Sequence, residues 1–147
     1  MSVAAATLAP LRASVECVAL DLPAPISTND LWTIRKSRAG KHYLSRTHEY
    51  EAWLKSAGWS LVAQKPGRVA GAYGLRLTVG RDSKIDLGNA EKAVSDLLEK
   101  YGVIDNDRFA SEIHLGWGDG EGMHALIVKA KDGAVSAEAT IDEARNV

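Results

Sequence analysis

One stretch of the chain, residues 73–102, limits the possible folds more than any other. Its first part, YGLRLTV, places apolar side chains at every second position, which is typical of a strand with one buried face. Its second part, from about residue 87 to Tyr101, repeats apolar residues at helical spacing, and Gly102 stands where a left-handed residue commonly ends a helix. We therefore expect a sheet with an amphipathic helix packed against it.

Weaker signals on both sides extend this pattern to a single α+β (mixed α/β) domain with a mixed sheet and two main helices. The domain is expected to span residues 15–131, between an Ala-rich tail at 1–14 and a polar tail at 132–147. The other expected elements are a strand at 15–20, a short hairpin near 42–44, a helix from Ser45 or Thr47 to about Gln64, and strands at 111–117 and 123–130 joined as a hairpin through the Gly-rich residues 118–122.

The composition excludes several classes of protein. Of the 147 residues, 46% are hydrophobic and 25% charged, which suits one soluble globular domain with its own core. The single cysteine, Cys17, rules out an internal disulfide and a cysteine-rich zinc site, and it favours a cytoplasmic location. Its place in an apolar strand predicts a buried thiol, and Trp53 and Trp59 are expected to pack in the core. No apolar run is long enough to span a membrane.

The formal net charge of −1 hides a strong asymmetry along the chain. Residues 31–68 hold eight basic and two acidic side chains, whereas residues 69–147 hold nine basic and fourteen acidic ones. A basic segment of this kind can bind a polyanion, while the acidic half can supply carboxylates to a cation. The simpler alternative is that both are solvated faces of one domain.

Polar residues that can carry chemistry lie at the joints around the second helix. If the turn IDND or the strand after it passes beside the end of the first strand, carboxylates from both joints converge near an ammonium group. Such a site suits Mg²⁺ or Mn²⁺, which prefer oxygen ligands, and a lysine can hold a phosphate oxygen. The residues concerned are Asp82, Asp86, Asn89, Lys92, Asp105 and Asp107.

The same residues also have an ordinary structural explanation. Asp86 and Asn89 favour a helix N-terminus, Lys92 is a common surface residue, and residues 105–107 suit a solvated turn. Spacing alone leaves both interpretations open.

The stretch DLGNAEKAVSDLLEKYGVIDND, together with LPAPISTNDLW near the start, resembles the RusA-type Holliday junction resolvases. That family has an early Leu-Pro-x-Pro-x-Ser-x-Asn element, then Asp-x-Asp-Asn-x-x-Lys, Asp-x-Leu, a glycine and an Asp-Asp turn. The matching residues are Pro23, Pro25, Ser27, Asn29, Asp86, Asn89, Lys92, Asp96, Leu98, Gly102 and Asp107.

The resemblance implies a RusA-like, homodimeric, Mg²⁺-dependent endodeoxyribonuclease that nicks opposed strands of four-way DNA junctions. By motif position, Asp86 and Asp107 would be metal-binding catalytic carboxylates and Lys92 the catalytic lysine. The sequence departs from the family at Gly88, where the second Asp of Asp-x-Asp is expected, and at Asn106. A neighbouring acid, Asp82, Glu91 or Asp105, can take the vacant role, or the site can bind one ion through two carboxylates.

These expectations combine into one mechanism with two alternatives. Mg²⁺, or Mn²⁺ in its place, would activate water for attack on phosphorus while the basic surface docks junction phosphates. The alternatives are a branched-DNA-binding module that does not cut and a nuclease for other branched DNA. The residues expected to contact DNA are Asn29, Arg35, Lys36, Arg38, Lys41, Arg46 and Asn89.

Overall fold

A buried central strand, β4 (Tyr73–Gly80), organises the fold. The computed structural model describes residues 12–25 and 32–131, and these form one small α+β domain of a mixed four-stranded sheet and two helices. The other elements are β1 (Cys17–Leu22), β2 (Trp32–Lys36), β3 (His42–Arg46), α2 (His48–Ala63), α3 (Leu87–Lys100), the 3-10 helix η1 (Asp107–Phe109), β5 (Ala110–Gly118) and β6 (Met123–Lys129).

The main sheet has the strand order β1-β6-β4-β5. β4 and β5 are parallel and joined through α3, whereas β1 with β6 and β6 with β4 are antiparallel. The predicted mixed sheet is confirmed, but the predicted hairpin between the two late strands is wrong because β4 lies between them. Gly80 N donates to Gly122 O at 2.8 Å, so the Gly-rich loop crosses the end of β4 instead of turning back on itself.

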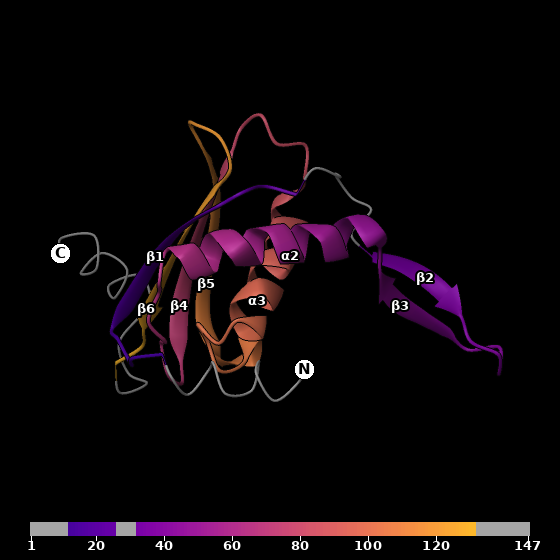
Figure 1. The fold of residues 1–147 in the computed structure, drawn as a ribbon, viewed down its shortest axis with the longest axis horizontal. Coiled ribbons are helices and arrows are strands. Elements are labelled where there is room, and N and C mark those ends of the chain that lie inside the picture. Colours follow the sequence, from indigo (N-terminus) through magenta and orange to yellow (C-terminus); the bar gives the residue numbers. More distant parts are fainter. Residues whose placement is uncertain (1–11, 26–31, 132–147) are drawn as a thin grey trace.

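Both helices lie on one face of the sheet, with α2 crossing in front of the strands (Figure 1). The residues of β4 that point to this face, Tyr73, Leu75, Leu77 and Val79, are completely buried. The helices approach closely at Gly58, where an added Cβ would lie 2.1 Å from Tyr101 Oη. Only glycine permits this contact, which sets the position of α2 against the end of α3.

The ends of both helices follow the predicted caps. Thr47 Oγ1 accepts a hydrogen bond from Tyr50 N at 3.2 Å, and Asp86 Oδ1 accepts one from Asn89 N at 2.7 Å. Gly102, with a φ of 75°, provides the left-handed residue that ends α3. Two of the strongest sequence signals therefore act locally as expected.

β2 and β3 form a separate two-stranded sheet, with Trp32 opposite Arg46. This ribbon, residues 32–46, leads into the first turn of α2 and projects away from the main sheet (Figure 1). The short hairpin predicted near residues 42–44 corresponds only to the second strand of this ribbon, and the first strand, at 32–36, was not predicted.

Two burial predictions are wrong. Cys17 is exposed because β1 buries alternate residues beginning with Val18. Trp59 is 72% exposed because it lies off the buried stripe of α2, whereas Trp53 is buried and its indole N–H donates to Pro23 O at 2.8 Å. No helix within the described ranges is long and apolar enough to cross a membrane.

Candidate functional site

A pocket of about 350 Å³ between α3 and η1 brings together charged residues that the sequence singled out. Lys92 and Asp107, both predicted catalytic residues, line this pocket. The other lining residues are Glu91, Ser95 and Asp96.

The chain after α3 holds Asp107 against the helix. Asn106 Oδ1 accepts a hydrogen bond from Arg108 N at 3.0 Å, which caps η1. The amide of Asp107 donates to Glu99 Oε1 at 2.9 Å, and Tyr73 Oη donates to the carbonyl of Asp107 at 3.4 Å. These contacts fix the backbone at Asp107, so the carboxylate has a defined place in the pocket.

The pKa of Tyr73 reflects the negative charges around this pocket. Burial raises the pKa of Tyr73 above its usual range, and the negative charges of Asp107, Glu91 and Glu99 raise this pKa further. The phenol therefore stays protonated and acts as a donor. The carboxylates give the pocket a negative potential, next to the ammonium group of Lys92.

Asp96 connects the pocket to α2 and to the ribbon. Tyr50 Oη donates to Asp96 Oδ2 at 2.5 Å, and burial followed by this contact raises the pKa of Tyr50. Arg46, the last residue of β3, lies 3.7 Å from Asp96 and 3.8 Å from Glu51, with its guanidinium 5.6 Å from the Tyr50 ring centroid. Arg46, predicted to contact DNA, thus joins the base of the ribbon to one wall of the pocket.

Asp86 and Asn89 lie at the first turn of α3 and bond to each other. Asp86 Oδ2 also accepts from Asn89 Nδ2 at 3.1 Å, so the carboxylate serves the helix cap through both oxygens. Asp107 contacts α3 through the Glu99 side chain and lines the pocket together with Glu91 and Lys92. Asp86, at the N-cap of α3, is not among the residues that line this pocket.

The IDND turn was predicted to approach the end of the strand at 73–79, and the register of β4 with β5 shows that this prediction is wrong. In the parallel pair, Ala110 lies opposite Tyr73, so η1 arrives at the start of β4. Asp82 and Asp86 follow the opposite end of that strand. A helical crossover between parallel strands necessarily has this geometry, because α3 returns the chain along the full length of β4.

Asp82 and Asp105 also lie outside this pocket. Asp105 accepts from Arg68 Nε at 2.6 Å and from Gly71 N at 3.0 Å, holding the loop before β4. Burial alone would raise the pKa of Asp105, but the Gly71 amide and the Arg68 guanidinium together lower it. Asp82 lines a second hollow, of about 470 Å³, with Lys84, Glu121 and the Gly-rich loop.

Gly88, the departure from the family motif, is not required by the backbone. A Cβ at this position would lie 3.5 Å from Asp86 Oδ1, an ordinary contact, and the φ angle of Gly88 is not in the left-handed region. The first turn of α3 therefore has room for the missing carboxylate.

The ribbon concentrates positive charge. Residues 32–46 contain five arginines and lysines and no acidic residue. Ile34 is 71% exposed on the same ribbon. Four of the predicted DNA contacts, Arg35, Lys36, Arg38 and Lys41, are exposed there, while Asn29 lies outside the described residues.

Glu91 was predicted only as a substitute ligand and Asp96 only as a motif match, although both line the pocket. The signal was available, because Glu91 with Ser95, and Lys92 with Asp96, stand four residues apart on a predicted helix and share a face. Ser95 Oγ donates to Glu91 Oε1 at 2.8 Å. Tyr73 and Tyr50 could not be found in this way because tertiary packing alone brings them to the site.

Comparisons with known proteins add no assignment. No protein-family model matches this sequence, and none of the curated proteins compared with it matches significantly. Within the described part of the chain, no group of three or more His, Cys, Asp or Glu side chains is placed to hold a metal ion together.

Proposed function

We propose that this protein is a metal-dependent endodeoxyribonuclease that binds and cuts branched DNA, in the manner of the RusA-type resolvases that its sequence resembles. The observation that carries the proposal is the adjacency of two unlike surfaces. An acid-free ribbon with five basic residues is attached, through Arg46 and Asp96, to the wall of the pocket that contains Lys92 and Asp107.

The ribbon is suited to hold DNA. Exposed Arg and Lys side chains bind phosphates mainly by releasing counterions, and a two-stranded ribbon is narrow enough to enter a major groove. The ribbon projects from the sheet (Figure 1). Its base contacts Asp96, which lines the pocket with Lys92, so a duplex bound along the ribbon would pass close to this lysine.

The residues of the pocket suggest how the protein would bind and hydrolyse a phosphodiester. Lys92 would bind a non-bridging phosphate oxygen and stabilise the negative charge that develops on phosphorus. The hydrogen bonds from Asp107 N to Glu99 and from Tyr50 to Asp96 keep the carboxylates on either side in place. No covalent intermediate with the chain is needed for attack by water.

The resemblance implies Mg²⁺, with Mn²⁺ as a substitute, held by Asp86 and Asp107. Asp86 holds the cap of α3 through both carboxylate oxygens and does not line the pocket with Asp107. Glu91 and Asp107 do line the same pocket, and two carboxylates with several waters suffice for Mg²⁺. A bound ion there would lower the pKa of water and neutralise phosphate charge.

The test compares a synthetic four-way junction with a linear duplex of the same sequence, with and without Mg²⁺. The proposal predicts Mg²⁺-dependent nicking of the junction and little cutting of the duplex. Tight junction binding without cutting in Mg²⁺ or Mn²⁺ would instead identify a non-catalytic branched-DNA-binding module. Equal cutting of flaps and other branched DNA would identify a nuclease without junction preference.

The homodimer and the cytoplasmic location belong to this proposal as well. The homodimer is supported by the resemblance, and the location by the single exposed cysteine, which suits a reducing compartment.

A further inference from the structure

β5 forms one edge of the main sheet. It pairs with β4 on one side, and no strand lies on its other side in residues 12–25 and 32–131. The strand is nine residues long and contains neither proline nor lysine, the residues that commonly block strand addition. Such an edge offers a row of backbone donors and acceptors to another strand.

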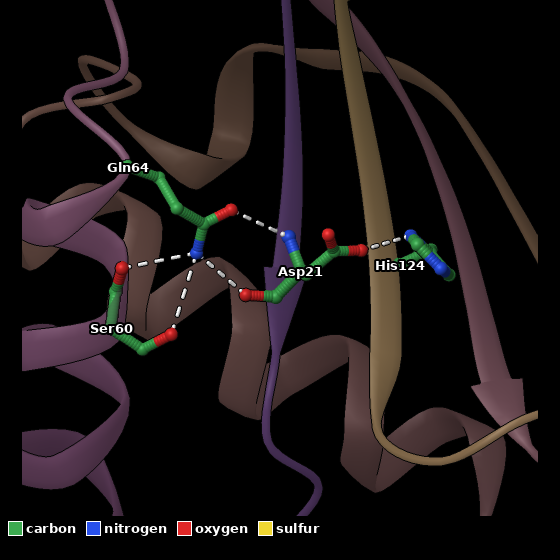
Figure 2. A network of polar contacts seen from close by, with 4 residues as sticks. All are labelled: Asp21, Ser60, Gln64 and His124. Carbon is green, nitrogen blue, oxygen red and sulfur yellow. Dashed lines mark hydrogen bonds and ion pairs between the residues drawn. The ribbon is translucent and has the colours of Figure 1, made fainter.

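The opposite edge of the sheet is treated differently. There, the Gln64 side chain imitates a neighbouring strand at Asp21 of β1: its Oε1 accepts from Asp21 N at 2.9 Å, and its Nε2 donates to Asp21 O at 2.7 Å (Figure 2). The Gln64 Nε2 also donates a hydrogen bond to Ser60 O at 3.0 Å. One edge is thus capped by the side chain of Gln64, directly after α2, whereas β5 is longer and has large apolar side chains along one face.

An apolar row runs along the exposed edge. Ile113, Leu115 and Trp117 are 41%, 37% and 40% exposed and lie on the helix-covered face of the sheet, in register with buried residues of β4. Phe109, just before the strand, is 40% exposed. Large apolar side chains grouped on an unpaired edge mark an interaction surface.

We propose that a second copy of this chain pairs with β5 in an antiparallel arrangement, with the two-fold axis at Ile113. The sequence around Ile113 is complementary to itself in this register. Glu112 and His114 of one chain already pair at 3.1 Å, and in this register each lies opposite the other residue type of the partner, so that carboxylates and imidazoles alternate. The apolar rows of both copies adjoin on the opposite face.

Other registers are less favourable. An axis at Leu115 would place Glu112 and His114 opposite glycines of the partner, and an axis at His114 would oppose two imidazoles. In the register centred on Ile113, Phe109 of each copy lies near Trp117 of the other. The sequence therefore favours the register centred on Ile113 over these two alternatives.

The pairing has a consequence that rests on the proposed function. Antiparallel addition joins the two sheets into one and leaves the helices of both copies on the same face. The residue Asp107 lies six positions before the axis, so the two pockets would be on the order of 30 Å apart, facing one side. Two nicks in a two-fold symmetric DNA junction call for this kind of arrangement.

Solution mass tests the pairing without any DNA. The full-length chain is predicted to have twice its 15.8 kDa mass by light scattering, and Ile113→Lys should have the single mass. Val62→Lys, at a 46% exposed position on α2, is the matched control and should remain a dimer. Circular dichroism checks that both variants fold.

Cysteine pairing tests the register. In a Cys17→Ser background, Ile113→Cys should form an intermolecular disulfide under mild oxidation, because this residue faces its own copy across the axis. Leu115→Cys should form far less. Preferential linkage through Leu115→Cys would overturn the register.

Two further outcomes would overturn the interface itself. One is a dimer that survives Ile113→Lys. The other is a wild-type monomer whose β5 amides are protected from hydrogen exchange, which would show that another segment of the same chain covers the edge. A monomeric protein that cuts junctions would refute the dimer alone, and a dimer that does not cut would refute the nuclease alone.

Discussion

Tyr50 donates a 2.5 Å hydrogen bond to Asp96, and this contact joins α2 to the wall of the candidate site. Tyr50 is completely buried, so the free energy of the bond is not lost to competing water. Asp96 also forms an ion pair with Arg46, at the base of the basic ribbon. The stability of the helix pair and the placement of the ribbon therefore depend on one phenol.

Tyr50→Phe should lower the free energy of unfolding by about 1.5–3 kcal/mol, because it removes a hydrogen bond to a charged group and leaves the carboxylate without this donor. Urea denaturation measures the difference. Asp96→Asn keeps an acceptor for the phenol and should cost less. An equal or larger loss in Asp96→Asn would show that the ion pair with Arg46 matters more than the hydrogen bond.

The sequence was sufficient for the elements whose signals are local. The alternation in β4, the Thr47 and Asp86 caps and the Gly102 terminus depend on neighbouring residues, so both main helices and the strands of the main sheet were found within a few positions. β2 was not predicted. The strand order depends on contacts between residues that are far apart in the sequence. Whether the Gly-rich loop joins neighbouring strands depends on β4, whose buried side chains make it the central strand.

The candidate site was predicted only in part, because it too depends on contacts between distant parts of the chain. Lys92 and Asp107 were identified by motif resemblance, and tertiary structure does bring them to one pocket. The predicted place of the IDND turn beside the end of β4 was wrong because it depended on where the crossover helix returns the chain. Asp105 resembled a metal ligand in sequence, and only the fold places Arg68 beside it.

The pH dependence of stability should reveal Asp105. Its pKa is lower in the folded state than the ordinary value of 3.8, so its stabilising contribution is present at neutral pH and is lost as the pH falls through the folded-state pKa. Asp105→Asn should destabilise the protein by about 1 kcal/mol at pH 7 and by much less near pH 2. Asp119→Asn, at a fully exposed carboxylate, is the control and should have little effect at either pH.

The ribbon should determine how DNA affinity depends on salt. Arg35→Ala with Lys36→Ala should weaken binding and reduce the slope of log affinity against log salt by up to about 2, since each phosphate contact contributes about 0.9. The control pair, Lys55→Ala with Lys100→Ala, changes exposed lysines on the helices. A larger change in slope for the control pair would place the DNA elsewhere.

The second carboxylate of the site can be identified by parallel substitutions. Glu91→Gln should reduce Mg²⁺-dependent cleavage by 100-fold or more if this residue acts with Asp107, whereas Asp86→Asn, which preserves the helix cap, should retain most of it. The cleavage rates of the two variants in a single-turnover assay distinguish these roles. The reverse pattern would support the assignment of Asp86 that the resemblance implies.

The most direct test of the account is the cleavage rate of Lys92→Ala against Lys100→Ala on a four-way junction in Mg²⁺. Both lysines are exposed on α3, but only Lys92 lines the pocket with Asp107. The account predicts that Lys92→Ala binds the junction and cuts it at least 100-fold more slowly, while Lys100→Ala cuts at the wild-type rate. Undiminished cutting by Lys92→Ala would contradict it.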